Sequence, residues 1–321
     1  MKTLLEVKNL TTHFFSSRGV VKAVDGVDFS LDAGETLAIV GESGCGKSVT
    51  AYSIMRLVSA PGRTIAGQVF FEGKDLLLLP DEEMRRVRGH QISMVFQEPM
   101  TSLNPVFRVG EQIAEGLVLH LGLSTGEARN ETTELLKLVG IPSPAARSKD
   151  YPHQLSGGMR QRIIIAMALA CRPKLLIADE PTTALDVTIQ AQILELIDRL
   201  KAERKMGLIL ITHDLGVVAE RADRTAIMYA GRIVEYAATA ELFRNPRHPY
   251  TEGLLESLPQ RALPGKPLRT IPGYVPDLLD DLPGCGFCNR CPEKRGECKG
   301  NTPLMNEVAA GHFVRCWKFC S

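Results

Sequence analysis

The chain has 321 residues, of which 44% are hydrophobic and 23% charged, a composition typical of a folded protein that excludes a disordered one. A net charge of +1 without a long Lys/Arg run argues against nucleic acid as a partner. The longest apolar stretch, residues 163–171, is far shorter than the about 20 residues that span a bilayer. Charges interrupt residues 4–10, where a signal peptide would lie, so we expect a cytoplasmic chain.

The first elements that the sequence predicts are strands. Residues 4–10 alternate apolar and polar side chains, and residues 20–31 do so more loosely. Phe14 lies between them, next to Phe15. An aromatic side chain just before a nucleotide-binding loop can stack on a base, or it can be a half-buried strand residue. The residues alone leave both interpretations open.

A glycine-rich loop, Gly41-Glu42-Ser43-Gly44-Cys45-Gly46-Lys47-Ser48, follows the apolar strand predicted at residues 36–40 and precedes a predicted helix. Glycines let backbone N–H groups approach phosphate oxygens, and the start of the helix adds a partial positive charge. Lys47 can reach the β- and γ-phosphates, while the Ser48 hydroxyl can hold Mg²⁺. The context of strand, loop and helix predicts a nucleotide-binding loop rather than a plain glycine turn. The predicted nucleotide contacts are Gly41, Ser43, Gly44, Cys45, Gly46, Lys47, Ser48 and Val49.

Further along, the sequence predicts a strand at residues 67–72, its turn at 73–75 and a short charged helix at 80–88. A buried strand at 91–96 then ends in Gln97. Side chains at the carboxyl ends of strands lie where ligands bind in α/β folds. Gln97 is therefore a candidate site residue, although an ordinary exposed glutamine fits as well.

Residues 100–162 have the spacing of a helical insert, with helices at 110–121 and 127–138. The insert ends in Ser156-Gly157-Gly158, just before a helix predicted at 159–171. Small residues at the start of a helix can bind an anion through their N–H groups. A serine that caps the helix, followed by two flexible glycines, explains the same pattern.

Two more apolar strands end in polar side chains. The strand at residues 174–179 ends in Asp179 and Glu180, and the strand at 207–212 ends at His213. Asp179 can hold Mg²⁺ directly or through water, and Glu180 can prepare a water for attack on a γ-phosphate. A solvated acidic turn and a structural histidine are the alternatives. Asp186 predicts the cap of a helix at 187–204, and residues 225–236 predict a hairpin that turns at Ala230-Gly231.

In this order the motifs resemble the nucleotide-binding subunit of an ATP-binding-cassette (ABC) transporter, over about residues 1–245. The matching motifs are the glycine-rich loop, the Q-loop residue Gln97, the signature Leu155-Ser-Gly-Gly-Met159, the strand ending at Glu180, the D-loop Thr183-Ala-Leu-Asp186 and the switch residue His213. The resemblance implies an α/β fold of the P-loop NTPase (RecA-like) class. It also implies an antiparallel β subdomain, a helical subdomain at about 100–162 and a loop-rich extension with cysteines at 246–321.

The resemblance implies a role for each site residue. Lys47 and Ser48 contact the phosphates and Mg²⁺, and Gln97 senses Mg²⁺ and the attacking water. Glu180 polarises that water, and His213 binds the γ-phosphate. All three of Gln97, Glu180 and His213 are thus expected to serve catalysis.

For the remaining site residues the resemblance implies contacts with the base and with a second subunit. Phe14 is the best match to the aromatic residue that stacks on adenine, with Phe15 as the other choice. Ser156, Gly157 and Gly158 of one subunit close over ATP held by the opposite subunit. The expected working unit is therefore two cassettes with ATP between them.

The segment after residue 245 begins with Asn245-Pro-Arg-His-Pro-Tyr-Thr251 and resembles the tail of ATPase subunits of dipeptide, oligopeptide and nickel importers. Its prolines predict loops with little regular structure. They are Pro259, Pro264, Pro267, Pro272, Pro276 and Pro283. Such a segment needs a staple to be ordered.

Six of the eight cysteines follow residue 284, and they are the expected staple: Cys285, Cys288, Cys291, Cys298, Cys316 and Cys320. In a reducing cytoplasm, clustered cysteines indicate a metal before disulfides. Spacing alone selects residues 285, 288, 291 and 298 for an iron–sulfur cluster. The peptide-importer resemblance implies instead that Cys285, Cys291, Cys298 and Cys316 hold a 4Fe–4S cluster, and we adopt that set. Four thiolates also suit structural Zn²⁺, the rival metal.

These expectations together describe an ATPase that powers import of short peptides through a membrane permease, using ATP and Mg²⁺. The implied partners are a second, related ABC ATPase subunit, two transmembrane permease subunits and an extracytoplasmic peptide-binding protein. The chain would then lie at the cytoplasmic face of the membrane as a peripheral subunit.

Three alternatives stay open at this stage. Nickel or another small solute can replace peptide as the cargo within the same family. A non-transport ABC ATPase acting on DNA or ribosomes is a second alternative, but the chain has one cassette and no heptad run. A P-loop kinase or simple nucleotide-binding module leaves the signature and Glu180 unexplained.

Overall fold

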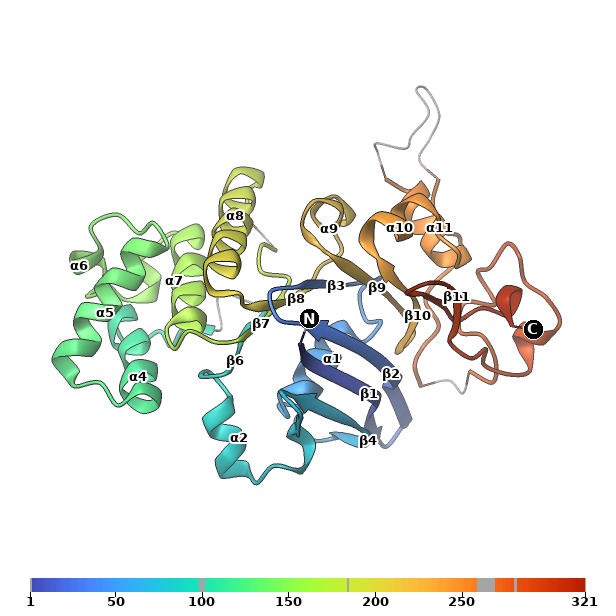
Figure 1. The fold of residues 1–321 in the computed structure, drawn as a ribbon, viewed down its shortest axis with the longest axis horizontal. Coiled ribbons are helices and arrows are strands. Elements are labelled where there is room, and N and C mark those ends of the chain that lie inside the picture. Colours follow the sequence, from blue (N-terminus) through green and yellow to red (C-terminus); the bar gives the residue numbers. More distant parts are fainter. Residues whose placement is uncertain (1, 98–101, 184, 259–268, 280–281, 321) are drawn as a thin grey trace. The chain divides into compact units, whose positions relative to one another are not determined.

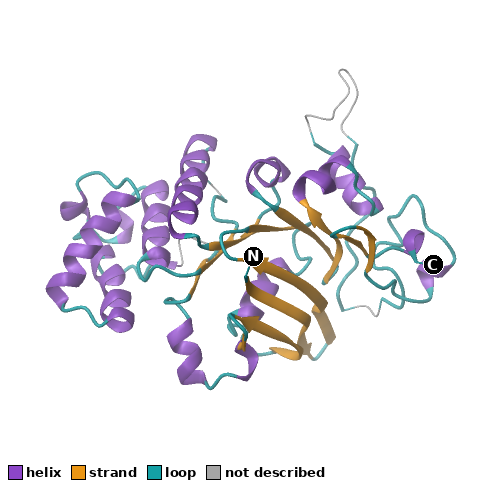
Figure 2. Cartoon of the chain, viewed as in Figure 1, coloured by secondary structure: helices purple, strands orange, loops and turns teal. Residues whose placement is uncertain are grey.

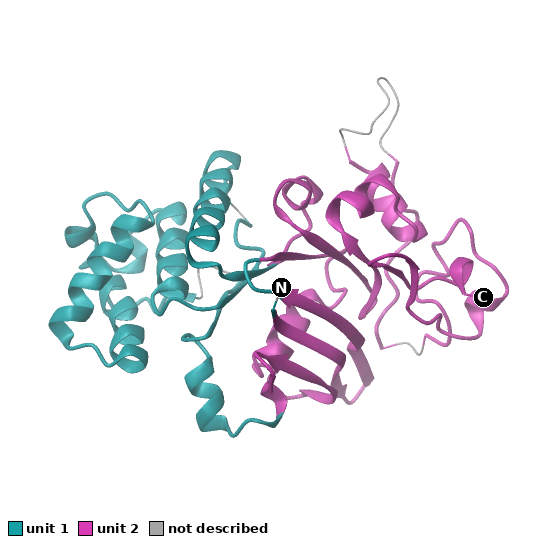
Figure 3. Ribbon diagram, in the orientation of Figure 1, with its two compact units in different colours: residues 1–2, 32–34, 78–209 teal, residues 3–31, 35–77, 210–321 magenta. Residues whose placement is uncertain are grey.

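The computed structural model contains both helices and strands, distributed along the chain (Figures 1 and 2). The structure describes residues 2–97, 102–183, 185–258, 269–279 and 282–320. The chain divides into two compact units (Figure 3). Unit 1 comprises residues 1–2, 32–34 and 78–209, and unit 2 comprises residues 3–31, 35–77 and 210–321. Ala184 of the D-loop and the prolines at 99, 259, 264 and 267 lie outside the described residues.

One sheet of unit 2 has four strands in the order β2-β1-β4-β5. They are β1 (Thr3–Ser16), β2 (Gly19–Asp32), β4 (Gly62–Phe71) and β5 (Lys74–Asp75). β4 pairs antiparallel with both β1 and β5, as the antiparallel β subdomain requires. The predicted turn at 73–75 was wrong. The chain turns instead at Glu72 and Gly73, which both have positive φ, and residues 74–75 form a strand.

The other strands of unit 2 follow the order β11-β12-β10-β9-β3 in their sheet. They are β3 (Thr36–Val40), β9 (Arg224–Tyr229), β10 (Arg232–Ala238), β11 (Asn306–Ala309) and β12 (His312–Val314). β3 and β9 are parallel, whereas β9–β10, β10–β12 and β11–β12 are antiparallel. Every residue of β3 is buried, as its continuous apolar sequence requires. The predicted hairpin turn at Ala230-Gly231 is confirmed.

The helices of unit 2 begin with the one that follows the glycine-rich loop. They are α1 (Lys47–Ile54), α9 (Leu215–Arg221), α10 (Thr239–Arg244) and α11 (Pro249–Glu256). The described residues near or within this unit also form the 3₁₀ turns η1 (Leu76–Leu78), η4 (Glu297–Lys299) and η5 (Trp317–Phe319).

The expectation of little regular structure after residue 245 was wrong in part. α11 forms because Pro249 presets the first helical φ and His248 caps the helix, its Nδ1 accepting a hydrogen bond from Tyr250 N at 3.1 Å. β12 pairs with β10 and β11, so the end of the chain extends the sheet that contains β3. The cysteine-bearing segment thus returns to the unit that contains the glycine-rich loop.

Unit 1 contains the parallel strands β6 (Ile92–Val95) and β7 (Leu175–Asp179). Its helices are α2 (Asp81–Val87), α4 (Val109–Leu121), α5 (Thr125–Leu138), α6 (Pro144–Arg147), α7 (Gly157–Leu169) and α8 (Val187–Arg204), with a 3₁₀ turn η2 (Pro152–Gln154). Helices α4, α5 and α7 pack against one another, which confirms the predicted helical insert (Figure 1).

The strand β8 (Gly207–Ile211) carries the chain from unit 1 to unit 2. At its start Gly207 N donates to Lys174 O at 2.8 Å, next to β7. Just after its end Thr212 N donates to Ile39 O at 3.3 Å, in β3. In the described parts of the chain, no helix has the length and apolar character that crossing a membrane requires.

Candidate functional site

The glycine-rich loop joins β3 to α1, and close packing leaves no space for a side chain at two of its glycines. A Cβ atom at Gly41 would lie 2.2 Å from Met228 O, and one at Gly46 would lie 2.1 Å from Ala23 O. Gly46 also has a φ of +108°, which an L side chain rarely adopts. Glycine is therefore required at both of these positions.

Lys47 brings a positive charge to the centre of this loop. Its Nζ donates to Gly41 O at 2.8 Å and to Glu42 O at 2.9 Å, and it lies 3.8 Å from Cys45 Sγ. The first N–H groups of α1 have no acceptor within the helix and carry its partial positive charge. Sulfur is a weak acceptor, so a phosphate oxygen can take the place of Cys45 Sγ as a partner of Lys47. The ammonium group of Lys47 and the first backbone N–H groups of α1 would then both bind the phosphates of a nucleotide.

Cys45 is a buried loop residue rather than a reactive thiol. It is fully buried, and this burial raises the pKa of its thiol more than the charge of Lys47 lowers it. A thiolate is the nucleophilic form of cysteine, so the raised pKa suppresses that reactivity. The structure agrees with its interpretation as a small residue of the loop.

In unit 1, the carboxylate of Glu180 is held by two donors. Gln97 Nε2 donates to Glu180 Oε2 at 3.1 Å, and Thr183 Oγ1 donates to the same oxygen at 2.8 Å. Glu180 has a φ of +46°, a conformation that costs energy outside glycine and that clusters at functional sites. Asp179, at the end of β7, is fully buried. The structure thus brings together Gln97 and Glu180, two of the three predicted catalytic residues.

The signature turn lies at the start of α7. Ser156 Oγ accepts a hydrogen bond from Met159 N at 3.3 Å, so the interpretation of Ser156 as a helix cap is confirmed. Ser156 and Gly157 are exposed, while a Cβ at Gly158 would lie 3.2 Å from Ile189 Cγ2. An exposed helix start is able to meet a ligand, but anion binding by this turn stays a prediction.

His213 and Phe14 both belong to unit 2. His213 is exposed after β8, and its neighbour Asp214 caps α9 by accepting hydrogen bonds from two backbone N–H groups. Phe14 lies on β1 opposite Gly62 and is half-buried. The Arg63 guanidinium lies over the ring of Phe15, 4.3 Å from its centroid. Because the Phe15 ring already has this partner, Phe14 is favoured as the base-stacking residue. Contacts of His213 and Phe14 with nucleotide stay predictions.

Sequence reasoning missed two sets of contacts around these residues. It assigned Thr183 only as part of the D-loop and not as a donor to Glu180. It also did not link the glycine-rich loop to the C-terminal segment, where Tyr250 OH accepts a hydrogen bond from Glu42 N at 3.0 Å. The positive φ of Glu180 is visible only in the structure, and no sequence pattern signals a contact between residues 208 positions apart.

Five of the six C-terminal cysteines line one small cavity, which His248, Phe287 and Trp317 also line. These cysteines are Cys285, Cys288, Cys291, Cys298 and Cys316. Burial raises the pKa of Cys285 to about 12, and the charges of the thiols at 291, 298 and 316 add to this shift. The four thiols chosen for the cluster are therefore near one another. Cys320 is not among the residues that line the cavity.

The side chains that line this cavity include thiols and an imidazole, which are possible metal ligands. All eight cysteines are free thiols. Within the described ranges, no three His, Cys, Asp or Glu side chains form a group that could hold a metal ion. His248 Nδ1 accepts from Tyr250 N, which places the ring proton on Nε2. That buried Nε2 has no hydrogen-bond partner among the described residues, and His248 lines the cavity.

The glycine-rich loop, the Gln97–Glu180 pair and the exposed signature turn, on this α/β fold, define an ATP-binding-cassette ATPase. Residues 24–183 match the ABC transporter family, and residues 234–298 match the family described as oligopeptide/dipeptide transporter, C-terminal region. The chain is thus an ATPase whose activity is coupled to transport.

Relatives along the whole chain define the family more closely. A probable peptide ABC transporter ATP-binding protein, y4tR of Sinorhizobium fredii, is 53% identical over 98% of this chain and 95% of its own length. The dipeptide transport ATP-binding protein DppD of Bacillus subtilis is 53% identical over 99% of this chain and 95% of its own length. The oligopeptide transport protein OppD of Salmonella typhimurium is 51% identical over 98% and 93%. The chain belongs to the family of ATP-binding proteins of dipeptide and oligopeptide ABC transporters.

Solved structures agree with this fold. The ATP-binding cassette MJ0796, in a dimeric post-hydrolysis state bound to ADP and Pi, has a TM-score of 0.66 at 28% identity. The similarity covers 73% of this chain and 98% of that one. The cassette cbiO1 from Clostridium perfringens has a TM-score of 0.64 at 27% identity, over 76% of this chain and 92% of that one.

Proposed function

We propose that the chain is the ATP-hydrolysing subunit of an importer of short peptides. The observation that carries this proposal is the match of residues 234–298 to the C-terminal region of oligopeptide/dipeptide transporters, together with relatives above 50% identity that are named for these cargoes. Nickel or another small solute is the alternative cargo. In this proposal residues 1–245 form the cassette and 246–321 the extension.

The proposed ATP site uses the residues of the glycine-rich loop for binding. Lys47 and the first N–H groups of α1 hold the β- and γ-phosphates, and Phe14 stacks on adenine. Ser48, with Gln97 and Asp179, would hold Mg²⁺, which neutralises phosphate charge when it is bound.

For hydrolysis, Glu180 accepts a proton from water as the water oxygen attacks the γ-phosphorus. The bond to the β-phosphate oxygen breaks, and ADP and phosphate result. Gln97 and Thr183 hold the carboxylate through the hydrogen bonds described above, so it is oriented before the substrate arrives. His213 contacts the γ-phosphate.

The proposed working unit has a second, related ATPase subunit, two permease subunits and an extracytoplasmic peptide-binding protein. The exposure of Ser156 and Gly157 supports contact of the turn Ser156-Gly157-Gly158 with ATP on the second subunit. Apolar side chains near α4 support docking of a permease at the cytoplasmic face of the membrane, since Val106 is 71%, Phe107 52% and Leu119 74% exposed.

Purification of the native complex tests the import function. We expect the affinity-tagged chain, extracted from its membranes in mild detergent, to bring with it two permeases and a second cassette. The complex in vesicles should then take up a labelled short peptide only when ATP is present. Uptake of nickel without peptide would select the alternative cargo, and co-purification with ribosomes or DNA instead of permeases would contradict the proposal.

A 4Fe–4S cluster held by Cys285, Cys291, Cys298 and Cys316 is the second part of the proposal. The position of these four thiols around one cavity supports the set, and the buried Nε2–H of His248, which lines the same cavity, can donate a hydrogen bond to a cluster sulfur. Four thiolates also suit structural Zn²⁺, which stays the rival metal at this cavity. The cluster would staple residues 285–316.

Paired cysteine variants test these ligands. Protein purified without oxygen should be brown, with a broad absorbance at about 400 nm. We expect Cys291→Ser to lose the iron and the colour, because it removes one of four ligands. Cys288→Ser, the matched control, should retain both. Colourless wild-type protein that contains zinc would contradict the cluster, and loss of iron from Cys288→Ser would contradict the ligand set.

A further inference from the structure

Glu42, the second residue of the glycine-rich loop, is held by the C-terminal segment at two points. Its backbone N–H donates to Tyr250 OH at 3.0 Å. Its carboxylate accepts two contacts from Arg290 Nη1, at 2.8 Å and 3.1 Å. Its backbone oxygen meanwhile accepts from Lys47 Nζ at 2.9 Å. One loop residue thus connects the phosphate-binding lysine with two residues that lie beyond position 245.

Arg290 is fixed by every nitrogen of its guanidinium. Nε donates to Pro272 O at 3.0 Å, Nη2 donates to Ile271 O at 3.3 Å, and Nη1 also donates to Tyr229 OH at 3.4 Å. The side chain of Arg290 is only 6% exposed, whereas that of Glu42 is 31% exposed. A buried charge of this kind depends on its partner, because removal of either member leaves the other uncompensated.

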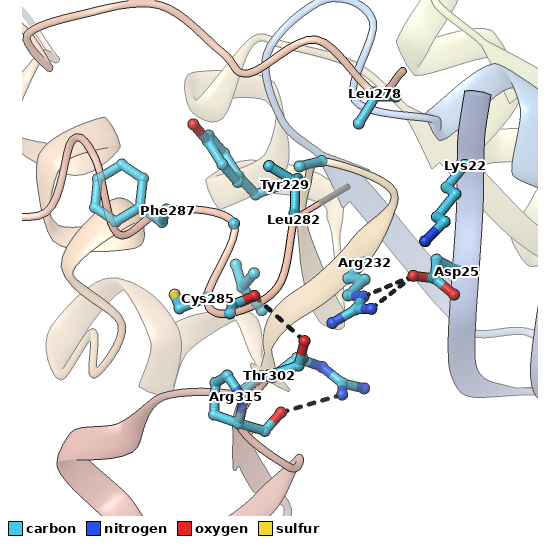
Figure 4. Close-up of a pocket in the computed structure, with 15 residues that line it drawn as sticks. Lys22, Asp25, Tyr229, Arg232, Leu278, Leu282, Cys285, Phe287, Thr302 and Arg315 are labelled. Atoms are coloured by element: carbon cyan, nitrogen blue, oxygen red, sulfur yellow. Dashed lines mark hydrogen bonds and ion pairs between the residues drawn. The ribbon is translucent and has the colours of Figure 1, made fainter. Parts of the chain in front are cut away.

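The position of Arg290 depends in turn on the turn that bears the cysteines. Arg290 N donates to Phe287 O at 3.0 Å, and Cys288 N donates to Cys285 O at 2.9 Å. Phe287 is buried, and its ring packs edge-on against Tyr229 with centroids 5.3 Å apart (Figure 4). The flanking residues Cys288 and Cys291 line the cysteine cavity. The backbone of Arg290 is thus part of the same hydrogen-bonded turn as the cysteines.

The negative charge of Glu42 affects nucleotide binding by the loop. A carboxylate in a phosphate-binding loop repels the phosphates unless a cation neutralises it. Arg290 supplies that cation and holds the loop residue next to Gly41 in place. We propose that Arg290 is a positioning residue for ATP binding that acts through Glu42, and that it couples ATP affinity to the cysteine-bearing turn. This inference needs only ATP binding by the loop, and not the cargo, the permeases or the cluster.

Titration of the purified full-length chain with a fluorescent ATP analogue tests the proposal. Arg290→Ala should raise the Kd for nucleotide about ten-fold, within the usual range of coupling between sites. Arg290→Lys keeps the charge but not the planar fork, so it should recover part of the affinity. Arg269→Ala is the matched control, because it removes an exposed arginine paired with Glu256 in the same segment, and its Kd should equal that of the wild type.

A double-mutant cycle separates positioning through Glu42 from a merely structural role. In a Glu42→Gln background the repelling carboxylate is absent, so Arg290→Ala should change the Kd by less than about three-fold. An equal loss of affinity in both backgrounds, or no loss in Arg290→Ala, would overturn the proposal. Thermal unfolding of each variant shows whether it is folded.

A measurement on the unmutated chain serves if the variants do not fold. Coupling is reciprocal, so bound ATP must also stabilise the cysteine-bearing turn. Alkylation of Cys288, measured by mass spectrometry, should be several-fold slower with ATP than without it. The same rate in both conditions would overturn the proposal. Failure of peptide import would not change this alkylation result, so the experiment tests the role of Arg290 separately from the proposed import function.

Discussion

Replacement of Glu180 by Gln is expected to lower the rate of ATP hydrolysis by about two to four orders of magnitude, the usual contribution of a general base. Gln has the shape of Glu and still offers an oxygen to Thr183 Oγ1, which donates to the carboxylate at 2.8 Å. It cannot accept the proton of the attacking water. The backbone strain at φ +46° is the same for both residues, so the change removes basicity and little else.

Steady-state phosphate release measures the expected loss of hydrolysis, and equilibrium nucleotide binding measures whether ATP affinity is retained. The Kd for ATP should stay within about three-fold of the wild type, because Glu180 does not neutralise the phosphates. Glu134→Gln is the matched control, since it removes an exposed carboxylate of the same unit that is paired with Lys137. Full turnover in Glu180→Gln would exclude Glu180 as the base and would contradict the assigned mechanism.

The elements that the sequence predicted well are those with continuous or periodic apolar patterns. β3 and β8 are runs of apolar residues and were found within one residue of their bounds, and α8 was found with the same bounds because Asp186 marks its start. The hydrogen bond from Ile189 N to Asp186 Oδ1, at 2.9 Å, confirms the reason for that boundary. Sequence patterns therefore predict an element well when residues close together in the chain determine it.

Elements at the end of the chain depend on distant partners and were missed. β12 has three residues, and its pairing with β10 joins Val314 to Glu235. That glutamate is fully buried and bonds His312 Nε2 at 2.7 Å, an arrangement that contradicts the usual exposure of charged residues. No hydropathy pattern indicates a buried polar pair of this kind.

The candidate site likewise contains residues that the sequence predicted and residues that only the structure reveals. Residue types at motif spacing predicted Lys47, Ser48, Gln97 and Glu180 as site residues, because phosphate and water chemistry restrict which side chains can serve. The residues that hold them in place carry no such restriction. Thr183, and the two contacts to Glu42 from beyond residue 245, follow only from the folded chain. A motif thus predicts which groups react, and the structure supplies the groups that hold those side chains in place.

Two neighbouring glycines of the loop should respond very differently to the same substitution. Gly46→Ala should destabilise the fold by about 3 kcal/mol, from overpacking and an unfavourable φ, and should abolish detectable ATP binding. The reason is geometric: its Cβ would lie 2.1 Å from Ala23 O and 2.7 Å from Met228 Cε. The backbone must move, and it carries the first N–H groups of α1 with it.

Gly44→Ala is the matched control, because Gly44 also has positive φ, +77°, but no atom lies within 4 Å of its Cβ position. It should cost only the conformational strain of about 1 kcal/mol. Urea unfolding gives the stabilities, and titration with a fluorescent ATP analogue gives the affinities. Equal effects of both changes would mean that φ alone, and not contact with Ala23, requires glycine at position 46. A larger effect at Gly46 would show that the close approach of the loop to Ala23 in β2 also requires glycine there.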